Sequence, residues 1–156
     1  MKFSTREDIE APADFVFDQM SDFQSYERQA LRRGADVRRL DDGQYTVGSS
    51  WDVAFTFRGK DRKLRAKIEE LIKPSLLRVS TDSSGLDGQT VLEIVPLSPR
   101  RTRIAASIEI KPKSLSARLM LHSLKLAKTN LTNRFKRRVA DFGEELEARY
   151  QKETQG

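Results

Sequence analysis

The stretch that decides the fold runs from residue 114 to residue 150 and reads SLSARLMLHSLKLAKTNLTNRFKRRVADFGEELEARY. Its apolar residues recur every three or four positions, with one gap of seven, which is the period of a helix with one apolar face. Ser114 is a suitable N-cap, so the pattern predicts one helix from Ser114 to about Tyr150, roughly 50 Å long. We expect residues 151–156 to form a frayed polar tail. The apolar stripe consists of Leu121, Leu124, Leu131, Phe135, Val139, Phe142, Leu146 and Tyr150.

The residues before this helix alternate between apolar and polar side chains, as antiparallel strands with one buried face do. The clearest strand places Trp51, Val53, Phe55 and Phe57 on one face. Connections between successive stretches are short, which leaves no room for crossover helices and predicts an antiparallel meander. Turn residues mark these connections at 41–43, 58–60, 73–74, 83–88 and 96–101.

The N-terminal part predicts a strand over Lys2–Glu10 and then two short helices. The first helix opens at Ala11-Pro12-Ala13, because proline is tolerated at the first helical position. The spacing Ser21-x-x-Gln24 is that of a capping box, and it predicts a second helix over 22–33 that Gly34 ends. The complete order predicts an α+β fold: a strand, two short helices, a run of about six antiparallel strands and one long C-terminal helix. Residues 1–150 form a single domain in this interpretation.

The composition excludes several classes of site. The chain of 156 residues contains no cysteine and one histidine, which excludes disulfides, thiolate nucleophiles, cysteine-based metal centres and any site that needs two imidazoles. We therefore expect no metal, no cofactor and no recognisable catalytic residue. The longest apolar run has three residues, too short for a transmembrane helix or a signal peptide, and we expect a cytoplasmic protein.

The positive charge is concentrated in the C-terminal helix. Residues 113–138 carry eight basic side chains and no acid, so the rest of the chain, whose total is +6, has a net charge of −2. A basic segment suggests nucleic acid, but no recognition motif accompanies it. The cluster Arg134, Lys136, Arg137 and Arg138 also scatters around the helix, so we expect solvated charge and no nucleic-acid partner.

Four short segments, in this order, resemble the START-like superfamily, also called SRPBCC or polyketide cyclase/dehydrase-like, with the helix-grip fold of the birch-pollen allergen. They are residues 9–13 before Phe15-Val16-Phe17, residues 47–51, residues 68–74, and residues 95–97 followed by 101–104. The resemblance implies a helix-grip fold, in which a curved antiparallel sheet of about six or seven strands wraps around the long C-terminal helix. It also implies a deep apolar cavity between the concave face of the sheet and that helix. Members bind lipids, sterols, isoprenoids, polyketides or plant hormones, and a few catalyse cyclisation or dehydration. No catalytic residue is common to the superfamily, so none is assigned.

We therefore predict that the chain binds a small hydrophobic or amphipathic ligand, and we favour a binding protein over an enzyme. A cyclase or dehydratase acting on a polyketide-like substrate in the same cavity is the alternative, and it needs a convergent acid–base pair. Ordinary core packing is the competing interpretation of the apolar residues. The expected ligand-binding residues are Trp51, Val53, Phe55, Phe57, Leu64, Ile68, Val79, Ile104, Leu121, Leu124 and Lys128.

Lys128 lies within the apolar stripe of the helix rather than on its polar face. One hypothesis is that its ammonium points into the cavity and pairs with an anionic ligand group or with a carboxylate, Glu70 or Glu93. The simpler alternative is that the aliphatic stem follows the apolar surface and the ammonium reaches solvent.

Leu115, Leu119 and Leu126 form a second apolar stripe on the opposite side of the first half of the helix, beside His122. A helix that grips one sheet needs one apolar face, so the second one needs another cover. Packing against the helices of residues 12–33 is the commoner explanation. A homodimer partner or peripheral contact with a membrane is the alternative.

Overall fold

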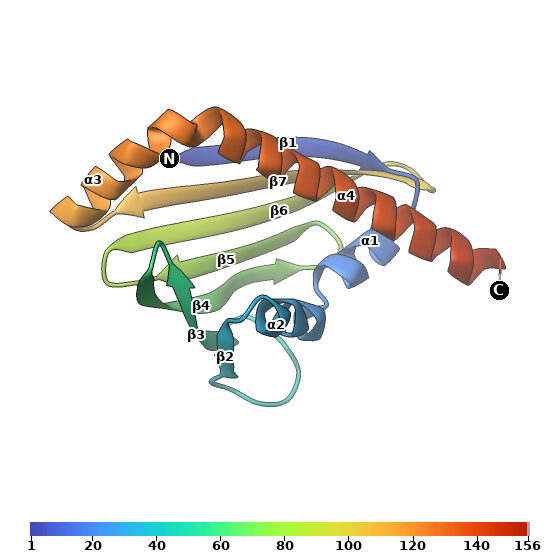
Figure 1. Cartoon of the computed structure of the whole chain (residues 1–156). Helices are drawn as coiled ribbons and strands as arrows, with labels where there is room; N and C mark the ends of the chain where they lie inside the picture. The colour runs from blue at the N-terminus through green and yellow to red at the C-terminus, as the bar shows by residue number, and fades with distance from the viewer. Residues whose placement is uncertain (156) are drawn as a thin grey trace.

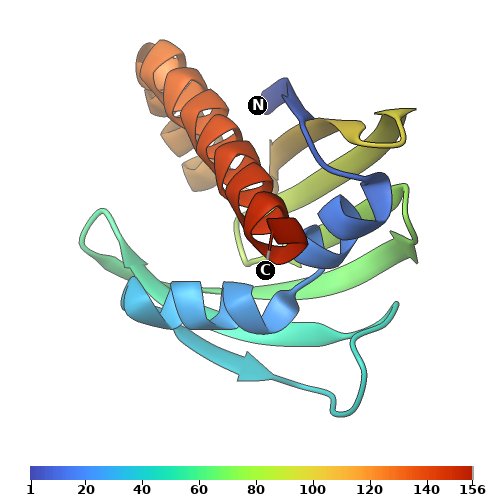
Figure 2. The same cartoon turned by 90° about the vertical axis from the view of Figure 1, so that its right-hand side faces the viewer.

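The alternating stretches form one sheet of seven antiparallel strands, in the spatial order β1-β7-β6-β5-β4-β3-β2 (Figure 1). A computed structural model describes residues 1–155. The sheet is strongly curved, and the helices lie inside its curve (Figure 2). The predicted α+β architecture is confirmed. The strands are β1 (Lys2–Ile9), β2 (Asp36–Arg39), β3 (Ser50–Phe57), β4 (Lys60–Ile72), β5 (Leu76–Asp82), β6 (Leu86–Ser98) and β7 (Arg101–Pro112).

The turn between β3 and β4 sets the register of the candidate site. Arg58 and Gly59 both have positive φ, 52° and 74°, and Phe57 pairs with Lys60 across the turn. Two central residues with positive φ make the tight turn whose twist matches that of a hairpin. The register then places Val53 opposite Leu64, and both side chains share one face of the sheet.

Two short helices follow β1, as predicted: α1 (Ala13–Met20) and α2 (Phe23–Arg32). The predicted capping role of Ser21 is wrong, because its hydroxyl donates back to the carbonyl of Phe17 at 2.8 Å. Asp22 is the N-cap of α2 instead, and its carboxylate accepts a hydrogen bond from the Ser25 backbone N–H at 3.2 Å.

The long C-terminal helix is confirmed but has an interruption. It comprises α3 (Leu115–Leu124), the 3-10 turn η1 (Lys125–Ala127) and α4 (Lys128–Gln155), and it bends between α3 and α4 (Figure 1). Ser114 caps α3 as expected, because its hydroxyl accepts from the Ala117 N–H at 3.1 Å. The expected frayed tail is helical as far as Gln155, and Gly156 lies outside the described residues.

The core has two parts. In the first, α1 and the C-terminal half of α4 pack on β1, β6 and β7 around Ile9, Ile104 and Leu146. Gly143 allows this close approach, since a Cβ added there would lie 3.4 Å from Cγ1 of Ile9. In the second, α2 covers β3, β4 and β5 through the aromatic ring of Phe23.

Packing of the second leucine stripe against the helices of residues 12–33, the favoured expectation, is wrong. Leu115, Leu119 and Leu126 are 73%, 62% and 93% exposed. The reason is position: α1 and α2 cover other parts of the sheet, and α3 lies at the far end of the molecule (Figure 1). No helix within residues 1–155 combines the length and apolar character needed to cross a bilayer.

Candidate functional site

The concave face of the sheet presents apolar side chains toward the C-terminal helix. Residues paired across neighbouring strands share a face, so Val79, Leu92 and Ile108 lie on the same side as the buried Ile68 and Ile104. The side chains of Val79, Leu92 and Ile108 are only partly buried. The middle of the helix contributes side chains that are also partly buried: Leu124, Leu131, Phe135 and Val139.

An open groove of about 1540 Å³ lies at the end of the sheet nearest α3. Ligand pockets are typically about 300–1,000 Å³, so this space is large enough for a lipid-sized molecule. Its walls are the β3–β4 hairpin, the β5–β6 hairpin, the end of β7 and the first turns of α3. Its apolar lining includes Phe55, Leu64, Leu86, Ile110 and Met120.

The helix is held to the sheet on both sides of its middle. At one end Ala117 packs on the β5–β6 hairpin, where a Cβ added to Gly85 would lie 3.3 Å from that of Ala117. At the other end Gly143 lies against Ile9. Between these contacts the stripe from Leu124 to Val139 is partly buried. The groove lies at the first of these contacts, where the helix contributes Ala117, Leu119 and Met120 to its lining.

Charged residues at the rim fasten the start of α3. Lys113 Nζ contacts carboxylate oxygens of Asp82 and, at 3.2 Å, Asp87. The hydrogen bond from Lys113 lowers the pKa of Asp82 and raises the pKa of Lys113 itself. Arg58, at the tip of the β3–β4 hairpin, reaches the hydroxyl of Ser123 at 3.5 Å. These pairs join both hairpins to the helix.

The structure divides the predicted lining residues into three groups. Phe55 and Leu64 line the groove, and Val53, Val79 and Leu124 are partly buried on the same face or on the helix above it. Phe57 is at the hairpin tip and 41% exposed. The remaining apolar members are buried in the core or under α3: Trp51, Ile68, Ile104 and Leu121.

Trp51 belongs to a hydrogen-bonded aromatic cluster under α2. Its indole N–H donates to Glu27 Oε1 at 3.2 Å, and the same oxygen accepts from the hydroxyl of Tyr45 at 2.7 Å. The Tyr45 and Trp51 rings stack with centroids 6.0 Å apart. Beside them burial raises the pKa of Tyr26 to about 12, and its hydroxyl donates to the Met20 carbonyl at 2.7 Å. The cluster joins α2 to the sheet.

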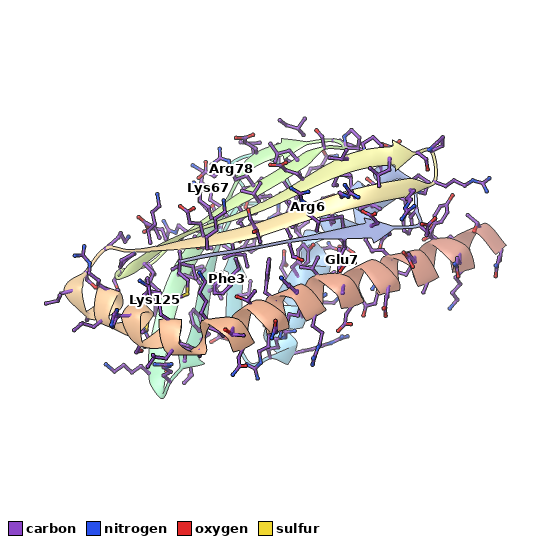
Figure 3. The ribbon with its side chains drawn as sticks, turned by 90° about the horizontal axis from the view of Figure 1, so that it is seen from above. Phe3, Arg6, Glu7, Lys67, Arg78 and Lys125 are labelled. Carbon is purple, nitrogen blue, oxygen red and sulfur yellow. The ribbon has the colours of Figure 1, made fainter. Side chains whose placement is uncertain are left out.

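Lys128 is exposed and forms no ion pair within residues 1–155. The suggested carboxylate partners are wrong, because both lie on the outer face of the sheet. A bulge in β4 pairs Glu70 with Arg78, which donates to it at 2.7 Å and lies on the face turned away from α4 (Figure 3). Glu93 alternates with the inward Leu92 and Ile94, so it also points outward.

Sequence reasoning missed several residues of the site. Thr81, Leu86, Ile110 and Met120 line the groove. Extending the alternation of Val79 by one pair would have found Thr81, and extending that of Ile104 would have found Ile110. Glu7 was also missed: it alternates with Phe3 and Ile9 on the concave face, and its side chain lies on the helix side of β1 (Figure 3). Within residues 1–155 no cluster of histidine, aspartate and glutamate has the arrangement needed for a metal ion.

No protein-family model matches this sequence, and no curated protein matches it. Solved structures do match. A protein of Thermus thermophilus has a TM-score of 0.62 at 12% identity, over 95% of this chain and 98% of that one. The Zhui aromatase/cyclase of a Streptomyces species has a TM-score of 0.58 at 13% identity, over 85% and 89%. Norcoclaurine synthase of Thalictrum flavum has a TM-score of 0.60 at 17% identity, over 80% and 82%.

These similarities extend over most of each chain. Identities this low establish a shared fold and carry no activity with them. The chain has the helix-grip fold of these solved structures, which is the fold that the resemblance in its sequence predicted.

Proposed function

We propose that the chain binds a small hydrophobic or amphipathic molecule, lipid-, isoprenoid- or polyketide-like, in the groove between the sheet and the C-terminal helix. The observation that carries the proposal is the apolar concave face, which the chain leaves partly uncovered around a space of about 1540 Å³. Uncovered apolar surface in a concave site is stabilised when a ligand removes it from water, by about 25 cal/mol per Å².

The accessible members of the predicted set are the ones that would touch the ligand: Val53, Phe55, Leu64, Val79 and Leu124. The buried members Trp51, Ile68, Ile104 and Leu121 would form the layer behind them, and Phe57 would lie at the entrance. Lys128 is exposed and forms no ion pair within residues 1–155. Leu131, three residues later and therefore on a neighbouring part of the same helix surface, is partly buried. In this proposal its ammonium meets the anionic end of an amphipathic ligand.

Native mass spectrometry of the purified protein would detect a co-purified ligand. A titration with the neutral dye N-phenyl-1-naphthylamine then locates the site by comparing two variants of the same strand. Leu64→Gln adds a polar group to the groove, and we expect about tenfold weaker dye binding. Lys67→Gln, on the outer face (Figure 3), is the matched control and should bind as the unchanged protein does. Equal affinity in both variants would place dye binding elsewhere and contradict the proposal.

The role of Lys128 is tested with two probes. Replacing it in Lys128→Met should weaken binding of oleate, which is anionic, and leave binding of the neutral dye unchanged. If oleate binds equally well to Lys128→Met, the lysine reaches solvent and takes no part in recognition.

The catalytic alternative, a cyclase or dehydratase, needs an acid and a base that face the ligand. Glu7 is a carboxylate on the concave face, and the residue before it on the same face is Thr5, which does not act as a base at neutral pH. The groove lining mixes apolar with polar and charged side chains; of its carboxylates, Asp61 accepts a hydrogen bond from Thr56, and Asp82 and Asp87 pair with Lys113. Because these carboxylates are already paired at the rim, we favour binding over catalysis.

A further inference from the structure

One surface of the molecule is not explained by ligand binding. Leu115, Leu119 and Leu126 project from α3 and η1 and are 73%, 62% and 93% exposed. We call these three residues the α3 leucine face. Large apolar side chains exposed together mark an interaction surface.

The fold itself directs this face outward. The buried residues of α3 include Ala117 and Leu121, and Leu115 and Leu119 each lie two residues before one of them. Two residues correspond to about 200° around a helix. Because the inner side of α3 is anchored on the β5–β6 hairpin through Gly85, the leucines face solvent at the far end of the molecule (Figure 1).

The charges around the leucines favour an anionic partner. Arg118, Lys125 and Lys128 are exposed, and residues 113–138 contain no acid. Figure 3 shows Lys125 at the bend of the helix. The acids nearest the start of α3, Asp82 and Asp87, are paired with Lys113. A second copy docked on the same face would bring these unpaired cations together, which like-charge repulsion disfavours.

We propose that the α3 leucine face docks on the surface of an anionic lipid bilayer, with the leucines among the acyl chains and Arg118, Lys125 and Lys128 at the headgroups. A leucine face flanked by basic residues is the composition of helices that lie in a membrane interface. Anionic headgroups attract such residues within a Debye length. Leu119 and the adjacent Met120 also line the groove, so docking would bring the groove entrance to the membrane. That last step rests on the proposed function; docking itself does not.

Vesicle flotation with the full chain tests the docking. The probes are phosphatidylcholine vesicles with and without phosphatidylserine, at low salt. We expect binding to the phosphatidylserine vesicles only, lost in about 1 M salt, where the Debye length is about 3 Å. The variant L115S/L119S/L126S should bind at least about tenfold more weakly. Leu31→Ser removes a 54% exposed leucine of α2 and serves as the matched control, which should bind normally.

A charge pair completes the test. R118Q/K125Q should weaken vesicle binding several-fold, whereas R137Q/R138Q, which removes two charges farther along the same helix, should weaken it less. Circular dichroism and the urea unfolding midpoint show that each variant is folded.

No vesicle binding by the unchanged protein, or equal losses in the leucine variant and Leu31→Ser, would overturn the proposal. So would a dimer in solution that L115S/L119S/L126S dissociates, because the face would then belong to a second copy. Vesicle binding and dye binding are separate readouts, so failure of one proposal is distinguishable from failure of the other.

Discussion

Leu146 and Leu131 lie on the same helix and differ in burial, which makes them a direct test of how tightly the helix is packed along its length. Leu146 is fully buried between α1, β1 and β7, whereas Leu131 is partly buried in the middle of the helix, between its two anchored ends. Replacing each with alanine removes the same atoms. The difference between the two losses of stability therefore reports the packing beneath each part of the helix.

The magnitudes follow from two contributions. Leu146→Ala loses the transfer free energy of the removed carbons and leaves a cavity in a packed core, which together cost about 3–5 kcal/mol in comparable sites. Leu131→Ala loses only part of the transfer free energy, because the side chain is partly exposed in the folded protein. We expect about 1–2 kcal/mol for this variant. The predicted difference is about 2–3 kcal/mol.

Urea unfolding monitored by circular dichroism measures both free energies of unfolding, and unchanged m-values would confirm that the comparison is two-state. A saturating ligand should stabilise the unchanged protein further, because it binds only the folded state. Equal losses above about 3 kcal/mol for both variants would refute the reasoning. The middle of the helix would then be packed as tightly as its C-terminal half.

Three further outcomes are expected. Asp22→Ala should lower the free energy of unfolding, measured by chemical denaturation, by about 1 kcal/mol, because it removes the N-cap of α2. Ser21→Ala should lower it by less, and a larger loss for Ser21→Ala would contradict the assignment of the cap. The hydrogen bond from Arg39 lowers the pKa of Asp41 to about 2 from 3.8, so the ionised Asp41 stabilises the folded protein above about pH 4 and this stabilisation is lost as the pH falls through 2. Asp41→Asn should therefore flatten the acid-unfolding profile between pH 4 and 2, and an unchanged profile would refute this. Because burial raises the pKa of Tyr26 to about 12, its stabilisation is lost between about pH 10 and 12. Burial also raises the pKa of Tyr45, so ultraviolet absorbance at pH 11 should show fewer phenolates in the folded than in the unfolded protein, and Tyr26→Phe should reduce that difference.

Much of the architecture could be predicted because strand alternation and helix period act locally. The alternation in β3 placed Val53 and Phe55 on the concave face, and the residues Arg58-Gly59 placed the hairpin turn. Alternation alone could not separate core from groove. Trp51 and Phe55 share a face, yet α2 covers the first and leaves the second beside open space. That distinction depends on where a distant helix lies.

Other predictions failed where a local irregularity changed the geometry. The bulge after Ile68 changes the register of β4, so Glu70 meets Arg78 on the outer face. The cap of α2 moved by one residue because the Ser21 hydroxyl is bonded to the Phe17 carbonyl. The spacing of residues in the sequence does not reveal where a strand has a bulge, nor which of two possible partners a serine hydroxyl will bond.

The groove and the α3 leucine face meet at the start of α3. Close contact at Gly143 and at Gly85 holds the C-terminal helix to the sheet at both ends. Because Ala117 must point inward at the second contact, residues about 200° away must point outward, and in this chain they are leucines. A protein that needed only a gripping helix would gain solubility from polar residues there. That the sequence keeps leucines beside Arg118 and Lys125, next to the groove entrance, is the strongest physical argument that this end of the molecule meets an anionic apolar surface.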